Sequence, residues 1–432
     1  MRQVHIYAPF QSPRLTYVLK LIFTHWLKIP YKLTHHWDDL SSEDCCVCYG
    51  VPHEKFISIP ACGLLQEEKI SILHPATGSW EDLPVFFTEE TSYTLPFDLL
   101  SAIFYLVSRQ EEYYPHAPDH YGRYPAQNSI LYQLHCLNRP LADEWLNKFY
   151  QLLQLKGISG NPDSFYYQPT YDIDIAYSYK YKGFFRTTGG FLRDFLRRDF
   201  QAMRTRASVI FGKKLDPYDC FERLLAWHQQ YELHPRYFIL SALQTTAYDK
   251  NNDPRHPMMQ RLIKRLAQEG TVGMHPSFYA HEERIFQNEK KHLEDTIRHP
   301  ITQSRQHYIH MTMPTTYQLL LRHDITDDFS MGYGTHNGFR AGTGRSFPWY
   351  DLSKNAETNL WVHPFCFMDA TAKYYEKLSP SEAGRVLDQY YSLSKSLGIP
   401  MITVFHNFSL GTDNAWKGWN EMYSQFLENF RK

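Results

Sequence analysis

Two aspartates separated by one residue form a pair that could do chemistry. Asp172 and Asp174 lie in the stretch TYDIDIAYSYKYKG, residues 170–183, where a strand is expected to end. Side chains alternate along a strand, so both carboxylates should share one face. Carboxylates this close repel each other unless a cation lies between them or one takes up a proton. The pair therefore indicates a metal-bound water with a neighbouring general base; the alternative is that both residues cap the next helix or turn.

Polar side chains also follow other predicted strands of the second half. Strands are predicted at 167–172, 236–240, 271–274, 304–307, 360–363 and 401–405, and they alternate with helices at about 220–231, 258–268, 281–297, 315–322, 381–397 and 415–431. This alternation predicts an α/β fold with a parallel sheet or barrel. Functional side chains of a barrel lie where its strands end. We therefore expect these residues to converge: Asp172, Asp174, His275, His307, His363 and His406.

The first half follows another pattern. A strand is predicted at 4–8, and helices at about 14–27, 97–112 and 141–155. Turn-forming residues gather at 157–163 and predict a boundary, since 432 residues exceed one ordinary core. We predict a smaller N-terminal α/β domain at 1–160, of no assigned role, and a second domain at 165–432. Because the first domain adjoins the predicted saccharide site, we expect that it extends the binding cleft.

Composition narrows the class of protein. Hydrophobic residues make up 43% and charged residues 21%, and the net charge of -1 provides no global field to attract nucleic acid. Aromatic residues, at 16%, suit stacking against sugar rings as well as core packing. The seven cysteines lack zinc spacing, and Cys45, Cys46 and Cys48 lie in a predicted buried strand, so a reducing compartment is expected. Without a leader or a long apolar run, we expect a cytoplasmic protein with no transmembrane segment.

A basic, apolar stretch lies between the first strand of the second half and its helix. Residues 191–211 place Leu192, Phe195 and Leu196 against several arginines, among them Arg197 and Arg198. One interpretation is a surface helix with a solvated basic face. The other is a lid or docking face for an anionic carrier, such as a lipid-linked or nucleotide-linked saccharide, with peripheral membrane contact.

Four motifs in order give the second half a resemblance to a known family. They are TYDID at 170–174, GMHPSFY at 273–279, GFRAG at 338–342 and VFHN at 404–407. With them, residues 165–432 resemble the polysaccharide deacetylases of carbohydrate esterase family 4, particularly a bacterial branch with an extra N-terminal domain. The resemblance implies a distorted (β/α) barrel. In the first half, 109–113 and 119–123 resemble the accompanying domain.

The resemblance implies a role for each motif. Asp172 corresponds to the general base, Asp174 and His275 to metal ligands, and His406 to the general acid. Arg340 corresponds to the arginine that orients the base, with Arg345 as the alternate. Arg340 could instead pair with Asp327 or Asp328, and a lone strand-end imidazole such as that of His363 is interpreted as a packing residue.

The sequence departs from the family at one metal ligand. The family carries a second histidine four residues after the first, where this chain has Tyr279. His281 and His307 are the available replacements, and the position of His307 at a predicted strand end favours it. The proline-rich continuation after the family's arginine is also missing, so no oxyanion donor is assigned.

The expected function is that of a metal-dependent hydrolase that removes N-acetyl or O-acetyl groups from a saccharide. Its cofactor would be a divalent metal, with zinc favoured by the ligand types. One alternative is a catalytically impaired saccharide-binding protein on the same fold. Another is a glycosyltransferase that uses the Asp-x-Asp pair, which has no use for His275 and His406.

Overall fold

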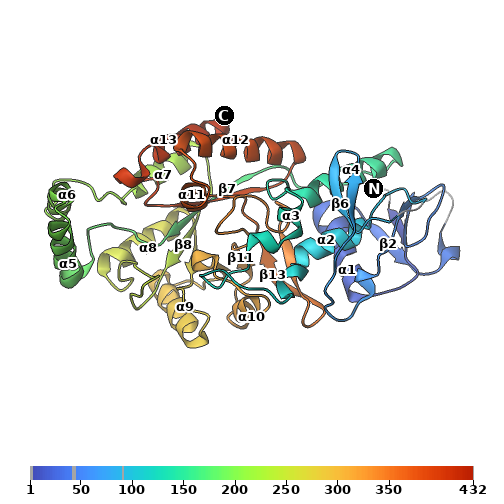
Figure 1. Cartoon of the computed structure of the whole chain (residues 1–432), viewed down its shortest axis with the longest axis horizontal. Coiled ribbons are helices and arrows are strands. Elements are labelled where there is room, and N and C mark those ends of the chain that lie inside the picture. The colour runs from blue at the N-terminus through green and yellow to red at the C-terminus, as the bar shows by residue number, and fades with distance from the viewer. Residues whose placement is uncertain (1–2, 41–44, 90–91, 432) are drawn as a thin grey trace.

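A nine-stranded sheet organises the second half of the chain (Figure 1). The structure is a computed structural model that describes residues 3–40, 45–89 and 92–431. The strand order is β12-β13-β11-β10-β9-β8-β7-β15-β14, and within the described residues β12 and β13 are the antiparallel pair of an otherwise parallel sheet. The strands are β7 (Tyr167–Ile173), β8 (Arg236–Leu240), β9 (Thr271–His275), β10 (Gln303–Ser304), β11 (Asp327–Asp328), β12 (Phe347–Asp351), β13 (Ala356–Val362), β14 (Phe367–Met368) and β15 (Met401–His406).

The sheet ends at β12 on one side and at β14 on the other. In the part of the chain that the structure describes, no pairing joins these two strands into a ring. The predicted α/β fold with a parallel sheet is confirmed. The pairing does not show closure, so the distorted (β/α) barrel stays a prediction.

Strand β7 lies between β15 and β8 and positions the aspartate pair. All seven of its residues are buried, as is usual for a parallel strand covered on both faces. Its register with β15 puts His406 opposite Asp172, and the register of β8 with β9 puts Leu240 opposite His275. The carboxyl ends of these four strands therefore lie side by side.

Helices flank the sheet with boundaries that the sequence sets locally. They are α7 (Phe221–Gln230), α8 (Pro257–Glu269), α9 (Glu283–Ile297), α10 (Thr315–Arg322), α11 (Asp369–Tyr374), α12 (Pro380–Leu397) and α13 (Trp419–Leu427). At α12, Ser379 and Glu382 form a capping box, and Gly398 ends the helix with φ of 61°. The predicted helices are confirmed within a few residues, except that the last is broken into shorter pieces around α13.

Several elements differ from the prediction. Strands β11 and β14 have two residues each, too few to show a periodic pattern. Strand β10 ends at Ser304, so His307 lies beyond it in a turn of 3-10 helix, His307–Ile309. The helix predicted at 191–211 is part of a hairpin of two helices, α5 (Gly183–Leu196) and α6 (Phe200–Ile210), which projects at the left of Figure 1.

A smaller parallel sheet organises the first half. Its strand order is β2-β1-β3-β4, and a separate hairpin pairs β5 with β6. The elements are β1 (Val4–Tyr7), α1 (Pro13–Leu19), β2 (Tyr31–Thr34), β3 (Cys45–Tyr49), β4 (Ile57–Ile59), β5 (Thr77–Trp80), β6 (Leu83–Phe86), α2 (Leu99–Ser108), α3 (Ile130–Gln133) and α4 (Leu141–Leu155). Cys48 is buried, as expected of a packing residue, while the side chains of Cys45 and Cys46 lie outside the described residues.

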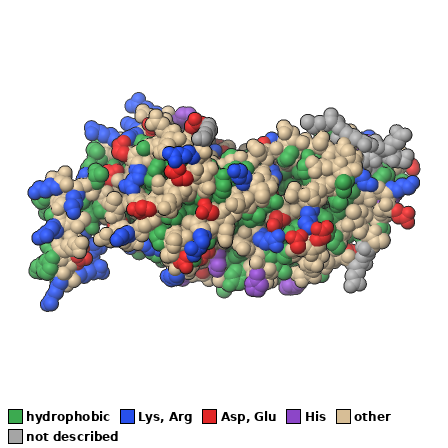
Figure 2. Space-filling model, turned by 90° about the horizontal axis from the view of Figure 1, so that it is seen from above, with side chains coloured by type: hydrophobic (Ala, Val, Ile, Leu, Met, Phe, Trp, Pro, Cys, Tyr) green, Lys and Arg blue, Asp and Glu red, His purple; other side chains and the backbone are tan. Residues whose placement is uncertain are grey.

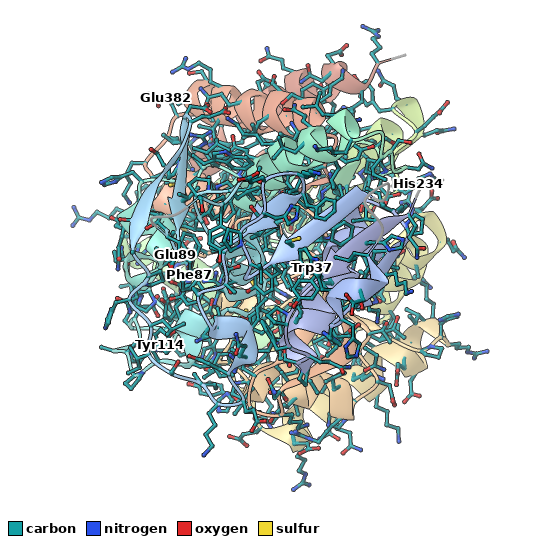
Figure 3. All side chains as sticks on the ribbon, turned by 90° about the vertical axis from the view of Figure 1, so that its right-hand side faces the viewer. Trp37, Phe87, Glu89, Tyr114, His234 and Glu382 are labelled. Atoms are coloured by element: carbon teal, nitrogen blue, oxygen red, sulfur yellow. The ribbon has the colours of Figure 1, made fainter. Side chains whose placement is uncertain are left out.

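The two sheets share one continuous hydrophobic core. Tyr17 of α1 donates to the carbonyl of Pro348 at 2.7 Å, and Trp26 donates to the carbonyl of Ser346 at 3.0 Å. Helix α1 and the turn after it thus pack against β12 and the residue before it, and Figure 3 views the molecule from the end of the small sheet, where Trp37 and Phe87 are labelled. The division into domains at 1–160 and 165–432 stays a proposal.

The described helices contain no candidate for a membrane span. Each of them is too short or too polar to cross a lipid bilayer.

A buried histidine makes stability depend on pH. His228 of α7 lies 2.8 Å from the hydroxyl of Tyr171 and 3.2 Å from that of Tyr237, and burial lowers its pKa to about 3. The folded-state pKa is below the ordinary 6.5, so only the unfolded chain takes up this proton as the pH falls. We predict that His228 removes about 2 kcal/mol from the free energy of unfolding between pH 7 and pH 5.

Urea unfolding at the two pH values measures this effect. His228→Gln should show a smaller loss of stability between them than the wild type, and exposed His281→Gln should behave as the wild type. Equal losses in the wild type and His228→Gln would show that His228 does not contribute.

Candidate metal and catalytic site

Three of the predicted residues form a compact group of metal-binding type. Asp174 follows β7, His275 ends β9, and His307 follows β10. One ligand atom from each lies within 4.8 Å of the others. Nε2 of His275 is 3.3 Å from Oδ1 of Asp174, and Nε2 of His307 is 3.7 Å from Oδ2 of the same carboxylate. The structure therefore brings together side chains from the carboxyl ends of β7, β9 and β10, with β8 lying between β7 and β9.

Both imidazoles are oriented by an acceptor behind them. Nδ1 of His275 is 2.5 Å from the backbone oxygen of Arg305, and Nδ1 of His307 is 2.9 Å from Oδ1 of Asp249. Asp249 also accepts from the backbone N of Phe278 and the hydroxyl of Thr246. When Nδ1 of a ring carries the proton, its Nε2 can offer a lone pair to a metal ion beside Asp174.

The group fits a divalent metal. Oδ1 of Asp174 is buried and has no hydrogen-bond partner among the described residues. Burial acts to raise the pKa of Asp174, but the imidazoles of His307, His275 and His406 hold it well below its usual value. Ligands of a tetrahedral zinc at 2.0–2.1 Å lie about 3.3 Å apart, close to the His275–Asp174 contact. One carboxylate and two imidazoles leave a fourth position open, as catalytic zinc sites do.

Asp172 is bound to an arginine that the sequence analysis did not single out. Its Oδ1 accepts from Nη1 of Arg305 at 2.8 Å, and its Oδ2 lies 3.8 Å from Nε2 of His275. Arg305 is fully buried and also donates to the backbone oxygen of Phe329. Asp172 is therefore positioned beside the metal group without belonging to it.

The predicted arginine, Arg340, is not in contact with Asp172. Its guanidinium donates to both carboxylate oxygens of Glu112, at 2.9 and 2.6 Å, and the alternate Arg345 donates to Asp143. The loop at 338–345 folds against the first half, so both arginines pair with acids there. The prediction that Arg340 orients the base is therefore wrong for this structure, and Arg305 occupies that position.

His406 lies on the other side of Asp174 and has its own carboxylate. Its Nδ1 is 2.6 Å from Oδ1 of Asp369, its backbone N donates to Oδ2 of Asp369, and its Nε2 is 3.6 Å from Oδ2 of Asp174. Burial acts to lower the pKa of His406, but Asp369 and then Asp174 and Asp172 raise it to about 10. Asp369 directly follows β14, a strand of two residues that is too short to show a periodic pattern, so the sequence carries no signal for it.

Three other candidates lie outside the group. Tyr279 and His281 are exposed, and neither supplies an atom to the ligand set. His363 contacts Asp327 at 2.8 Å and Ser346 at 2.7 Å, which agrees with its interpretation as a packing residue. Of the proposed replacements, His307 is the one that reaches Asp174.

A cavity of about 350 Å³ opens onto the group. Asp172, Asp174, His275, His307 and His406 all line it. Aromatic residues form much of the remaining wall, namely Tyr121, Tyr308, Tyr374, Tyr375 and Phe408.

The first half of the chain contributes to this cavity through Tyr121 and Arg123. Arg123 donates to Asp119 at 2.8 Å and to the backbone oxygen of Tyr308 at 3.0 Å, and it lies over the ring of Tyr121. These contacts tie the two halves together at the wall of the site.

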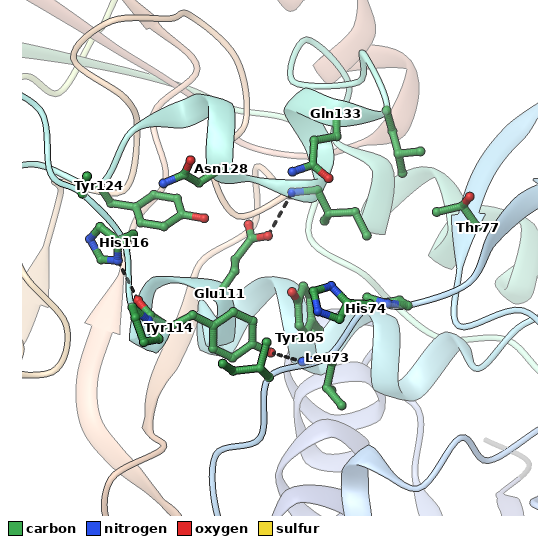
Figure 4. Close-up of a pocket in the computed structure, with 16 residues that line it drawn as sticks. Leu73, His74, Thr77, Tyr105, Glu111, Tyr114, His116, Tyr124, Asn128 and Gln133 are labelled. Carbon is green, nitrogen blue, oxygen red and sulfur yellow. Dashed lines mark hydrogen bonds between the residues drawn. The ribbon is translucent and has the colours of Figure 1, made fainter.

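A second cavity, of about 560 Å³, lies in the first half (Figure 4). Glu111 accepts from the backbone N of Ile130 there, and Tyr114 accepts from that of Leu73. Asp174, His275 and His307 are the metal-binding group found among the described residues, and none of them lines this cavity.

Comparisons with known proteins give a partial picture. Residues 4–157 match a family of unknown function, DUF7033, and no curated protein matches the chain. Among solved structures, one assigned as a polysaccharide deacetylase from Mycobacterium smegmatis is 13% identical and has a TM-score of 0.40, over 62% of this chain and 85% of that one. A polysaccharide deacetylase from Bacillus cereus is 13% identical, with a TM-score of 0.28, over 48% of this chain and 81% of that one.

A third similar solved structure is of a protein described as a pseudoenzyme. It is a pseudoenzyme of carbohydrate esterase family 4 from Bacillus anthracis, 9% identical with a TM-score of 0.28, over 51% of this chain and 59% of that one. The functional interpretation therefore rests on the side chains of this chain.

Asp249, which contacts His307 but is not itself a proposed ligand, allows a test of the metal group. We predict that Asp249→Asn lowers zinc affinity about 10-fold to 100-fold, because His307 loses the carboxylate that orients its ring. Isothermal titration calorimetry with zinc measures this. Asp253→Asn is the matched control, since Asp253 pairs with Arg255 at the surface. An unchanged affinity in Asp249→Asn, or an equal loss in both variants, would contradict the assignment of His307 as a ligand.

Proposed function

We propose that this chain is a metal-dependent hydrolase that removes acetyl groups from a saccharide, with an N-acetylated sugar as the main substrate class. One observation carries the proposal. The group of Asp174, His275 and His307 lies between Asp172, which is paired with an arginine, and His406, which is paired with a carboxylate. This arrangement combines a metal group, a proton acceptor and a proton donor in one cavity.

Asp174, His275 and His307 would hold the metal, and their types favour zinc. When bound, a divalent ion supplies a Lewis acid that polarises the acetyl carbonyl and lowers the pKa of water.

Asp172 is the proposed general base. The ion pair with Arg305 at 2.8 Å holds the carboxylate of Asp172 in one orientation. In its ionised form Asp172 accepts a proton from the attacking water, whose oxygen forms a bond to the acyl carbon. Arg305 acts through Asp172 and is therefore a positioning residue.

His406 is the proposed general acid. The pKa of about 10, set by Asp369 against the opposing effect of burial, keeps the imidazole protonated at neutral pH. As the C–N bond breaks, Nε2 of His406 gives its proton to the departing nitrogen. Acetate and an amino sugar result. For an O-acetyl substrate, the same proton goes to the departing oxygen.

The aromatic wall of the cavity suits a sugar ring. Tyr121 and Tyr308 pack together at a centroid distance of 4.9 Å, and both line the cavity. Aromatic faces stack on the apolar faces of sugars, and Arg123, which is paired with Asp119, also lines the cavity.

The geometry bears on the two alternatives. A glycosyltransferase would need both aspartates on its metal, yet Asp172 is occupied by Arg305. A catalytically impaired saccharide-binding protein would keep the aromatic wall and lose acetate release, so activity assays separate it from the hydrolase.

Acetate release tests the proposed function. Purified protein loaded with zinc should release acetate from N-acetylated saccharides, and a chelator should abolish the release. We predict that Asp172→Asn lowers kcat/KM by about 100-fold or more, because the base is lost. Asp295→Asn, an exposed change on α9, is the control. Activity that survives both the chelator and Asp172→Asn would overturn these roles, and saccharide binding without acetate release would favour the binding protein.

Tyr121 tests whether the first half contributes to substrate binding. We predict that Tyr121→Ala raises KM about fivefold with little change in kcat, because a stacking contact of about 1 kcal/mol is lost. Steady-state kinetics measure this, and Tyr166→Ala, which lies outside the cavity lining, is the control. An unchanged KM would show that Tyr121 does not contact the substrate.

A further inference from the structure

The hairpin of α5 and α6 exposes an unusual amount of apolar surface. Six of its phenylalanines and leucines are each more than half exposed, and Phe185 reaches 87%. They are Phe184, Phe185, Leu192, Phe195, Leu196 and Phe200. Large apolar side chains gathered on one projecting element mark an interaction surface in a folded protein.

Three of these side chains form one face of α5. Phe185, Leu192 and Leu196 recur at helical spacing, so they lie along one side of the helix. The buried side carries the polar contact instead: Asp194 of α5 pairs with Arg206 of α6 at 2.7 Å, and both side chains are 5% exposed. The buried ion pair thus joins α5 to α6, and the apolar face of α5 is exposed.

The same segment is strongly basic. Residues 180–214 contain ten Lys and Arg against two Asp, in a chain whose net charge is -1. One of those aspartates, Asp194, is already neutralised by Arg206. Figure 2 shows hydrophobic and basic side chains together on the lobe at the left end, where Figure 1 places α5 and α6.

The base of the hairpin is anchored to the body of the protein. Arg186 donates to the backbone oxygens of Asn251 and Lys250, and the carboxylate of Asp216 accepts from the backbone N of Lys180. The hairpin also begins in the loop that leaves β7 at Asp174. A surface bound by α5 and α6 would therefore be linked to the site by a short segment.

We propose that the α5–α6 hairpin binds the surface of an anionic lipid bilayer. Its apolar face would enter the region of the headgroups, and its arginines and lysines would pair with lipid phosphates. Charge complementarity selects this partner, because an excess of cations beside exposed Phe and Leu matches an anionic interface with an apolar interior. The inference does not depend on the proposed hydrolase activity.

Vesicle flotation with the full chain tests the proposal. One set of vesicles contains phosphatidylcholine alone, and the other contains about 30% phosphatidylglycerol. We expect binding to the anionic vesicles that is at least about tenfold tighter than to the neutral ones and that weakens as salt is raised. No binding to the anionic vesicles, or equal binding to both, would overturn the proposal.

Two sets of substitutions assign the binding to the hairpin. The triple variant Phe185→Ser, Leu192→Ser, Leu196→Ser and the double variant Arg197→Glu, Arg198→Glu should each lower vesicle binding about tenfold or more. The controls are exposed residues elsewhere, Leu155→Ser for the apolar change and Arg385→Glu with Lys417→Glu for the charge reversal. Full binding by either hairpin variant would overturn the proposal. A dimer would overturn it as well. If light scattering without lipid detects a wild-type dimer and the triple variant abolishes that dimer, a second copy of the chain covers this face.

Discussion

The placement of two carboxylates side by side at the end of one buried strand is the constraint on which the rest of the site depends. Asp172 and Asp174 would repel each other, and each is compensated by different partners. Arg305 binds Asp172, while the imidazoles surround Asp174, whose side chain is 16% exposed through the cavity. Asp249 and Asp369 then bind the outer nitrogens of His307 and His406. Each carboxylate at the strand end is therefore contacted by a basic side chain, and the imidazoles of His307 and His406 are each contacted by a further carboxylate. This arrangement separates the metal group from the base and the acid.

The sheet and the inner residues of the site could be predicted because they follow regular rules. A period of two, continued one residue past the end of β7, puts both aspartates on one face, and parallel strands end at one edge, which places His275 and His406 there. The outer residues follow no such rule. Asp249 lies in a loop, and Asp369 follows a strand of two residues, so neither has a periodic signal. A motif indicates Arg340, whereas the partner of Arg340 in the structure, Glu112, is 228 positions away in sequence.

The first half of the chain is part of the same physical unit as the site. Its core is continuous with that of the large sheet, and buried ion pairs such as Arg340 with Glu112 cross between the halves. Breaking such a pair leaves an uncompensated buried charge. The contribution of Tyr121 and Arg123 to the cavity agrees with the expectation that residues 1–160 extend the cleft. Sequence pattern alone could not show it, because these residues lie in an irregular loop.

Anomalous diffraction from crystals of the full chain grown with zinc would test the central claim most directly. The claim is that one divalent ion is bound by Asp174, His275 and His307. The account predicts a single strong peak at the zinc edge, with the carboxylate of Asp174 and Nε2 of both histidines around it, and with Asp172 and His406 beside it but not bound. A peak held by other side chains, or none at this group in crystals that contain zinc, would contradict it.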